Sequence, residues 1–430
     1  MSVVADAAAA PAARQRVFVG AWLVSTATAL AGVLTYAFLV LAARTLGPHA
    51  YGRVAALWGA IFIGAVVLYR PLEQTASRTI ADRLARGGDA RSVLRALASV
   101  GVVAVALTAG IVVAAWHPLT TRVFLGDRTL TLLLLCGTVA YGLSYLARGH
   151  VGGVRWFGGY AIVLLADGVA RLAVAAPLVL VASAHLAGAS MVAAGVAGAI
   201  VPFAFGRDRL RRVLAGRGSE ALEVRSALAF AAPATAIAAA DQLLVNGGPL
   251  LVIVDGGAHA AKAAGVVFAA TMLVRAPIYV FTGLAASMLP NLTALAAGGD
   301  KARFRAAVSR GSLALVGTGL ALVALVALGG EQAMLVLYGH RYAAGLGSLV
   351  LLAVGAACYL AAGTASQGLL ALDRGLAAAV AWVAGAVSFV ALFAALPGSE
   401  LGRVSLAFAL GMAICTTLIG IAVAREAWRA

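Results

Sequence analysis

The chain has 430 residues, of which 63% are hydrophobic and 11% are charged, and its mean hydropathy is +1.00. A soluble domain carries about 25% charged residues, so this chain has too few to cover a water-facing surface. In a soluble protein, the net charge of +16 would suggest a nucleic-acid partner. In a membrane protein, the simpler interpretation is positive charge in loops that stay on the cytoplasmic side. We therefore predict a polytopic membrane protein without a nucleic-acid partner.

Apolar runs of 18 or more residues, each long enough to cross a bilayer core of about 30 Å, recur along the whole chain. Charged or Gly/Pro-rich breaks divide them into twelve predicted spans at 17–43, 54–72, 93–115, 129–147, 159–181, 186–205, 227–251, 261–290, 308–329, 345–371, 376–396 and 404–424.

The first predicted span is longer than the apolar core of a cleaved signal peptide, which has about 7–15 residues, so we expect it to be retained as a helix. The three cysteines, Cys136, Cys358 and Cys415, all fall in predicted spans. They are interpreted as small apolar side chains, without a disulfide framework or a metal cluster.

Most of the 32 Lys and Arg residues fall in alternate loops, on the same side as the amino terminus. Arginine clusters at 70–95 and 207–218 dominate this side. The positive-inside rule therefore places both termini in the cytoplasm, with the protein in the bacterial cytoplasmic membrane.

Twelve spans divide into two sets of six. We predict an amino-terminal lobe at 1–206, a basic cytoplasmic connector at 207–226 and a carboxyl-terminal lobe at 227–430. The polar phrase "LARGGDARSVLR" at 84–95 returns as "LAAGGDKARFRA" at 295–306, after the second span of each half.

A second, weaker echo joins "YG" at 51–52 to "AAG" at 263–265. These repeats predict two lobes related by a pseudo-two-fold axis along the membrane normal. In each phrase, the glycine pair would make an elbow, and Asp89 or Asp300 would cap the following helix.

Several chemistries have no motif in the sequence. The two lysines, Lys262 and Lys301, do not follow glycine as a P-loop requires, and HExxH, GxSxG and metal-spaced Cys/His clusters are missing. Acids in the predicted outer loops are scattered, whereas glycoside chemistry uses a pair. We predict no enzyme activity, cofactor or metal.

Ionisable side chains inside spans are costly and are functional candidates by default. Asp167 and Arg171 lie four residues apart on one helix face, either as a structural ion pair or as part of a cavity. Asp241 is the acid of the seventh span. It is interpreted either as a proton or sodium site or as a hydrogen-bonding partner to other helices, through itself, Gln242 or Asn246.

Three further charged residues are candidates near the inner half of the spans. Arg275 needs an anion or a wet cavity, and either a phosphate or Asp241 would serve as its partner. Arg70 and Glu73 lie at the inner end of the second span, where an acid is unexpected under the positive-inside rule. We predict Asp241, Glu73 and Asp167 as candidate coupling-ion groups.

The seventh span contains Pro233 and the run Gly247, Gly248, Pro249. Interrupted helices in transporters line cavities, so we expect either a break or a helix end at this run.

Four segments together carry a family resemblance: "LAARTLGPHAYGRVAAL" at 41–57, "DQLLV" at 241–245, "RAPIYVFTGLAASMLPNLT" at 275–293 and "GLLALDRG" at 368–375. The first resembles the R-x-LG-x-x-x-YG signature of polysaccharide biosynthesis/export proteins. These are the O-antigen and oligosaccharide flippase branch of the multidrug/oligosaccharidyl-lipid/polysaccharide exporter (MOP) superfamily. The chain lacks the extra carboxyl-terminal helix pair of lipid II flippases, which argues against a peptidoglycan precursor.

The resemblance implies an all-α fold of two six-helix lobes around a central cavity that opens alternately to each side. It implies export of a polyprenyl-diphosphate-linked oligosaccharide by a monomer, alongside a polysaccharide polymerase and glycosyltransferases. Matching signature positions are Arg44, Gly47, Tyr51, Gly52, Asp241 and Pro290. The predicted contacts for an anionic head group are Arg70, Arg275, Arg171 and Arg44.

Three alternatives stay open. A drug/cation antiporter of the same superfamily is the nearest. A major facilitator transporter also has twelve spans, but its loop signature fails here because Arg78 and Ala85 replace its glycines. A membrane glycosyltransferase or polymerase would need a large outer loop bearing paired acids or basic residues, which the spacing of the spans leaves no room for.

Overall fold

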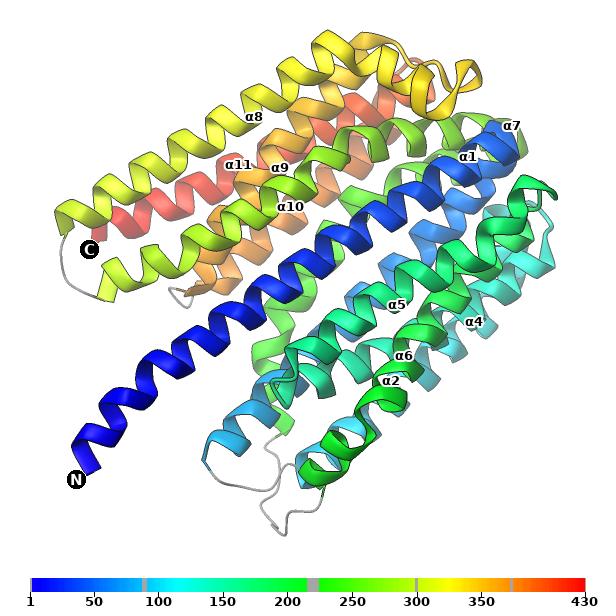
Figure 1. Cartoon of the computed structure of the whole chain (residues 1–430). Coiled ribbons are helices and arrows are strands. Elements are labelled where there is room, and N and C mark those ends of the chain that lie inside the picture. Colours follow the sequence, from blue (N-terminus) through cyan, green and yellow to red (C-terminus); the bar gives the residue numbers. More distant parts are fainter. Residues whose placement is uncertain (1, 87–90, 215–223, 298–300, 372–373, 430) are drawn as a thin grey trace.

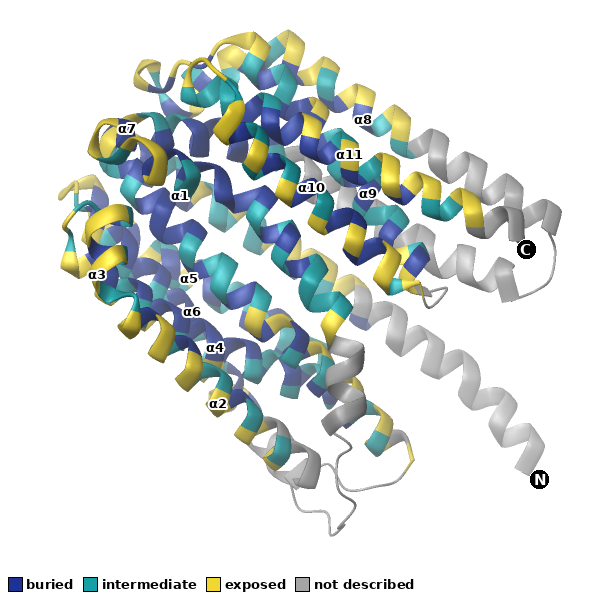
Figure 2. Ribbon diagram, turned by 180° about the vertical axis from the view of Figure 1, so that it is seen from behind, coloured by how far each residue is buried: buried dark blue, intermediate teal, exposed yellow. Residues whose placement is uncertain are grey.

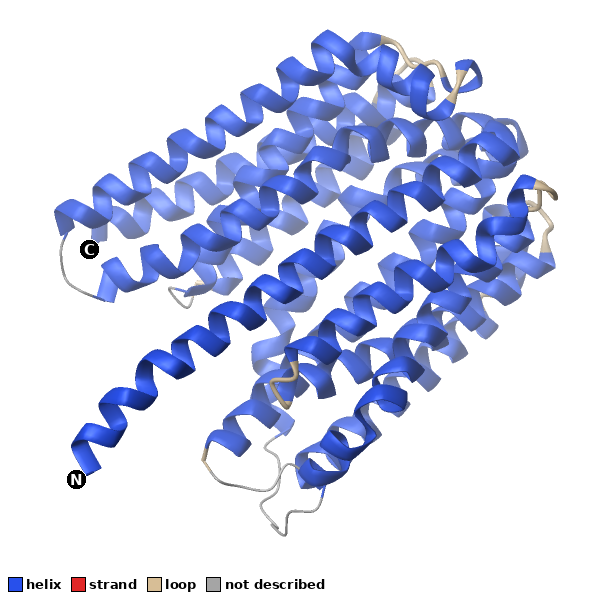
Figure 3. Ribbon diagram, viewed as in Figure 1, coloured by secondary structure: helices blue, strands red, loops and turns tan. Residues whose placement is uncertain are grey.

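The computed structural model describes residues 2–86, 91–214, 224–297, 301–371 and 374–429. These residues form helices joined by short loops, and none of them lies in a strand (Figure 3). The predicted all-α membrane fold is therefore confirmed.

The first half of the chain forms α1 (Ser2–Ala85), α2 (Arg91–Ala114), α4 (Arg128–Gly153), α5 (Phe157–Ala175) and α6 (Ala184–Leu214). The second half forms α7 (Val224–Ala297), α8 (Lys301–Tyr338), α9 (Leu346–Ala371), α10 (Gly375–Ala395) and α11 (Glu400–Arg429). Short turns complete the order: α3 (Trp116–Pro118), the π-helical η1 (Leu119–Val123) and the 3₁₀ helices η2 (Ala176–Val179) and η3 (His340–Tyr342).

Two of the long helices are broken by glycine. Gly47 in α1 has φ 71° and Gly257 in α7 has φ 56°, in the left-handed region that favours a residue without a Cβ atom. The apolar part of α1 is 63 residues long and that of α7 is 45, each enough for two crossings.

Among the described residues, nine helices are long and apolar enough to span a membrane. The bent helix pair Ala98–Ala114 and Trp116–Val123 gives a tenth when it is counted as one span. Counting the two broken helices as two spans each agrees with a twelve-span fold.

The span prediction was wrong at one point. Gly247, Gly248 and Pro249 lie within continuous helix, and α7 breaks only at Gly257. A Cβ atom on Gly248 would lie 3.1 Å from a methyl group of Val404. The glycine therefore serves the close approach of α11 and does not mark a helix end.

The helices gather into two bundles, one per half of the sequence. In the first half, α1 packs against α4 and α5, and α6 packs against both of these. In the second half, α9 and α10 pack against α11 (Figure 1). The main contact between the halves is α1 against α7. The predicted lobe boundaries stay a prediction, and residues 207–214 of the predicted connector continue α6.

Both termini lie at one end of the bundle, which we call the near end, and the breaks at Gly47 and Gly257 lie at the opposite, far end (Figure 1). The two repeated polar phrases fall between α1 and α2 and between α7 and α8. Their glycine pairs and Asp89 and Asp300 lie outside the described residues.

The two halves touch at the far end through a reciprocal glycine contact. A Cβ atom on Gly52 would lie 1.9 Å from the carbonyl oxygen of Ala261, and one on Gly265 would lie 2.1 Å from that of Pro48. Gly52 and Gly265 are the equivalent glycines of the second sequence echo. An exchange of equivalent positions is the signature of a two-fold relation, as the repeats predicted.

Burial follows this arrangement. Buried residues lie where helices meet, while exposed ones line the outer faces (Figure 2). Leu180 is 87% exposed and Leu328 is 85% exposed, which in water would leave large apolar patches. In a bilayer, these faces contact lipid.

Candidate functional site

A cavity of about 230 Å³ lies between the two halves. The first half contributes α1 residues, and the second half contributes residues of α7, α9 and α10. The lining residues are Arg70, Pro71, Gln74, Ala234, Ile237, Ala238, Asp241, Tyr359, Gly363, Ser366, Gln367, Leu370 and Trp382. Arg70 is roughly 35 Å of helix away from the break at Gly47, so the cavity lies toward the near end.

The two walls of the cavity carry different chemistry. On α1, Arg70 and Gln74 are one helical turn apart and present hydrogen-bond donors on one face. On the opposite wall, Asp241 is accompanied by the Tyr359 phenol and the Gln367 amide. A ligand with an anionic group on one side and hydroxyl groups on the other would find partners on both walls.

Neutral donors hold the carboxylate of Asp241. The Tyr359 hydroxyl donates to Oδ1 at 2.7 Å, and the Gln242 amide donates to Oδ2 at 2.8 Å. Asn246 in turn donates to the Gln242 carbonyl at 2.8 Å. Asp241 therefore forms a hydrogen bond to α9 and also lines the cavity, while its role as a cation site stays a prediction.

The first half contains a buried charge cluster built from α4 and α5. Asp167 accepts from Arg171, one turn away, and Arg148 Nη2 lies 3.5 Å from its other oxygen. Arg171, only 2% exposed, also donates to the Thr35 hydroxyl at 2.9 Å and to the Tyr141 hydroxyl at 2.8 Å. The i,i+4 ion pair expected from the sequence is present, and it lies within helix packing.

Glu73 lies on α1, three residues after Arg70 of the cavity wall. The Tyr160 hydroxyl donates to its Oε1 at 2.7 Å, and its side chain is 9% exposed. Arg148 and Arg70 are the nearby positive charges that act on it. Glu73 thus belongs to an electrostatic chain that runs from the cavity wall into the first half.

The other predicted site arginines lie elsewhere. Arg275 donates to the Val245 carbonyl at 3.4 Å, within the fold of α7. Arg44 lies at the far end and donates to the carbonyls of Val336 and Leu337, the latter at 2.8 Å. Of the four arginines predicted to bind an anion, Arg70 lines the cavity. The structure does not gather the other three around it.

Sequence reasoning missed Arg148, Tyr160 and Tyr359. Arg148 follows the predicted fourth span and was counted among the cytoplasmic-side charges. The two tyrosines sit in apolar spans, where a hydroxyl gives no periodic signal. Their partners come from other helices, so only tertiary contacts identify them.

Asp127 forms an ion cluster of a different kind at the far end, outside the spans. It caps α4 by accepting from the Thr129 amide at 3.0 Å, and His185 Nε2 and Arg53 Nη1 lie 2.8 and 3.2 Å from its Oδ2. Partial burial opposes ionisation, but the hydrogen bonds and the Arg53 charge outweigh it, so the pKa of Asp127 is lowered. This cluster ties α1, α4 and α6 together.

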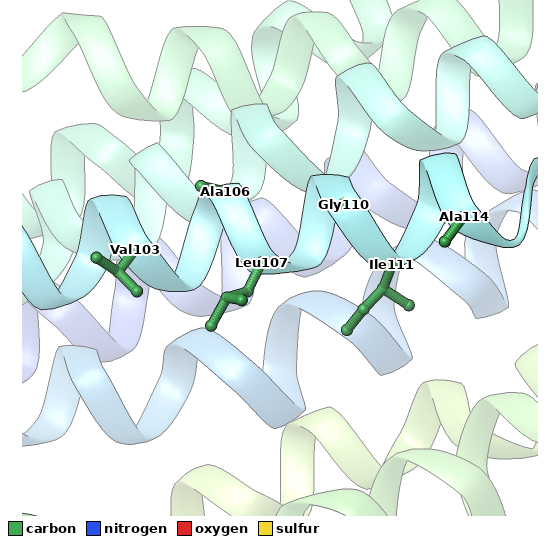
Figure 4. Close-up of a pocket in the computed structure, with 6 residues that line it drawn as sticks. All are labelled: Val103, Ala106, Leu107, Gly110, Ile111 and Ala114. Atoms are coloured by element: carbon green, nitrogen blue, oxygen red, sulfur yellow. The ribbon is translucent and has the colours of Figure 1, made fainter.

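A second hollow, of about 490 Å³, lies against α2 and is lined by apolar side chains and one glycine: Val103, Ala106, Leu107, Gly110, Ile111 and Ala114 (Figure 4). Leu107 and Ile111 project from the same side of the helix and are each 63% exposed. This hollow offers no polar group and is a lipid-facing surface. Among the described residues, no group of three metal-binding side chains gathers anywhere.

Solved structures of known transporters share the fold of this chain. No family model matches it. The solved inward-facing structure of a multidrug resistance MATE family transporter of the MOP superfamily superposes with a TM-score of 0.71, at 17% identity over 90% of this chain and 92% of the other. The outward-facing structure of such a transporter gives 0.65 at 14% identity over 93% of each chain.

A third solved structure, that of the MATE multidrug transporter DinF-BH, gives a TM-score of 0.68 at 17% identity, over 95% of this chain and 94% of the other. At these identities, the likeness shows the fold alone. The predicted superfamily fold is confirmed, while the flippase branch stays a prediction.

Two sequence relatives come from mycobacteria. The uncharacterized protein Mb3654 of Mycobacterium bovis is 31% identical over 413 residues, covering 93% of this chain and 90% of its own length. The uncharacterized protein Rv1510 of Mycobacterium tuberculosis is 31% identical over 330 residues, covering 75% of this chain and 72% of its own. The chain therefore belongs to the family of these mycobacterial proteins, and its fold is that of the MATE transporters of the MOP superfamily.

Proposed function

We propose that the protein is a transporter that moves a polyprenyl-diphosphate-linked oligosaccharide across the bacterial cytoplasmic membrane by alternating access, for polysaccharide biosynthesis. Both termini face the cytoplasm, the near end is the cytoplasmic end, and the protein works as a monomer. A polysaccharide polymerase and glycosyltransferases act on either side of this step. The transporter fold supports a transport role over an enzymatic one.

The observation that carries the proposal is the mixed chemistry of the cavity between the halves. Arg70 offers a guanidinium suited to a diphosphate, and the carboxylate, amide and phenol groups opposite suit sugar hydroxyls. The head group would enter from the near end while the lipid tail stays in the bilayer. Arg275, Arg171 and Arg44 remain in the proposal as secondary sources of positive charge.

Coupling to an ion is assigned first to Asp241. It lines the cavity, and its partners are neutral donors, so gain or loss of a cation changes the charge of the cavity wall. Glu73 is the second candidate, because it lies beside Arg70 and is hydrogen-bonded to a phenol. Asp167 is the third, since two arginines already balance its charge.

A drug/cation antiporter is the alternative function. Asp241 beside Tyr359, in a cavity with apolar Ile237 and Leu370, would also suit a lipophilic cation. The MATE fold supports both proposals equally. Arg70 distinguishes them, because a guanidinium in the cavity repels a cationic substrate.

The test is transport by the purified protein in proteoliposomes, with a labelled lipid-linked oligosaccharide and with ethidium as the cationic probe. We expect Arg70→Gln to slow flipping about tenfold, since one charge-assisted hydrogen bond contributes about 1.5–3 kcal/mol. Arg70→Lys should reduce the flipping rate less than Arg70→Gln does. The control is Arg122→Gln, a change at an exposed far-end arginine, which should leave the flipping rate unchanged. Ethidium export without flipping would favour the antiporter.

A further inference from the structure

We propose that Arg44 and Tyr342 form a latch that holds the far end closed, and that the R-x-LG-x-x-x-YG segment encodes this gate. The inference rests on the alternating access of the proposed function but not on its substrate. In an alternating-access cycle, the far end must open to release a ligand that entered from the near end.

The closed far end is a seam of backbone contacts between α1 and α7. Besides the reciprocal contact at Gly52 and Gly265, a Cβ atom on Gly59 would lie 2.8 Å from the Asn246 carbonyl oxygen, and the Tyr36 hydroxyl donates to the Met272 carbonyl at 2.9 Å. We call these contacts the far-end seam. A larger side chain at Gly52 would keep it from closing.

The latch adds three hydrogen bonds across the seam. The Arg44 guanidinium donates to the carbonyls of Val336 and Leu337 in the last turn of α8, and the Tyr342 hydroxyl donates to the Ala43 carbonyl at 2.7 Å. The last four carbonyls of a helix lack intrahelical partners and carry the negative end of its dipole. A guanidinium therefore suits this position.

Aromatic packing surrounds the Tyr342 part of the latch, while Arg44 is exposed. Tyr51 lies edge-on to Tyr342 at 5.8 Å and contacts Phe268 at 5.4 Å between ring centroids. Tyr51 and Tyr342 are fully buried side chains, so water is excluded from the hydrogen bond to Ala43. Four signature residues thus have a place: Arg44 in the latch, Gly47 at the corner, Tyr51 in the packing and Gly52 in the seam.

Both halves contribute equivalent glycines to the seam, but Arg44 of the first half has no matching latch residue among the described residues of the second half. The charged residue just before the second break, at Gly257, is Asp255. It pairs instead with Arg403 of its own half, at 2.7 Å. Opening therefore requires loss of bonds made by Arg44 and Tyr342 to backbone carbonyls, which water can satisfy in the open state. That exchange makes the latch reversible.

Distance measurements between spin labels in nanodiscs, on the full chain with its three cysteines replaced, test the latch without any substrate. One label pair, His49→Cys with His259→Cys, reports the far end. The other, Leu84→Cys with Leu376→Cys, reports the near end. All four positions are exposed.

We expect Arg44→Ala to shift the ratio of open to closed far ends about tenfold toward open, and Tyr342→Phe to shift it in the same direction by less. Gly52→Val should abolish the short far-end distance. Its matched control is Gly110→Val, because nothing lies within 4 Å of a Cβ atom there.

Unchanged far-end distances in both Arg44→Ala and Tyr342→Phe would overturn the proposal. If Arg44→Ala does not fold, Arg44→Lys and Tyr342→Phe decide it, since they keep the charge or the ring and remove hydrogen bonds. A moving latch in a protein that does not flip the oligosaccharide would overturn the substrate proposal alone.

Discussion

Asp167 in the first half and Asp241 in the second half are held in opposite ways. In the first half, Asp167 is paired with Arg171 and lies beside Arg148, so its negative charge is balanced inside the protein. In the second half, Asp241 is bonded to Tyr359 and Gln242, which carry no charge. A buried carboxylate with arginine partners is a structural element, whereas one with neutral partners can respond to a cation from outside. We therefore propose that Asp167 serves stability and that Asp241 serves the response to a cation.

The largest effect that tests this comparison is on stability. Arg171→Met removes the main counter-charge of Asp167 and leaves Tyr141 and Thr35 without their donor. We expect a loss of about 3–5 kcal/mol, because breaking this buried pair leaves Asp167 with only the more distant Arg148 as a counter-charge. Thermal unfolding in detergent measures it, with Arg122→Met as the control. The double variant with Asp167→Asn should recover part of the loss, and no recovery would contradict the pairing.

A smaller effect is expected from the matching change in the second half. Asp241→Asn keeps an acceptor for the Tyr359 hydroxyl and removes no ion pair that the structure describes. The free energy of unfolding should therefore fall by only about 1 kcal/mol. The same melting experiment compares it directly with Asp167→Asn, which leaves two arginines without their carboxylate. If Asp241→Asn destabilises the protein as much as Asp167→Asn, the two halves do not differ in the way described.

The smallest effect concerns Asp127, which has both kinds of partner. Asn also caps helices well, so Asp127→Asn loses mainly the pair with Arg53 and the bond to His185, about 0.5 kcal/mol at neutral pH. Because its folded pKa is lowered, this contribution is present above the unfolded value of about 4 and is lost as the pH falls through the lower folded value. The two proteins should therefore converge in stability in acid, and a constant difference would argue against ionisation.

Much of the fold could be predicted because apolar runs and arginine clusters are local features. The gap between the first two predicted spans, at 44–53, contains the α1 corner at Gly47. The prediction of a helix break or end at Gly247–Pro249 was wrong because glycine and proline also occur inside helices where another helix packs closely. Here α11 fills the space next to Gly248. The true break at Gly257 lies past that run.

The candidate site was harder to predict, since its members meet only in the folded chain. The pairing of Asp167 with Arg171 followed from helix periodicity, and it is present. Asp241 was one of two alternative partners predicted for Arg275, but the described partners of Asp241 are Tyr359 and Gln242. Arg148 looked like a loop charge because no sequence pattern reveals that α5 brings Asp167 toward it.

The most direct test of the difference between the halves is transport driven by an imposed ion gradient. The parent protein, Asp241→Asn and Asp167→Asn are each reconstituted in proteoliposomes that contain labelled lipid-linked oligosaccharide. Transport is then measured under a proton gradient and, separately, under a sodium gradient. We expect the gradient to increase the transport rate of the parent protein and, per folded molecule, that of Asp167→Asn. The gradient should have no effect on transport by Asp241→Asn. Equal stimulation of Asp241→Asn and the parent would contradict the assignment of coupling to the second half.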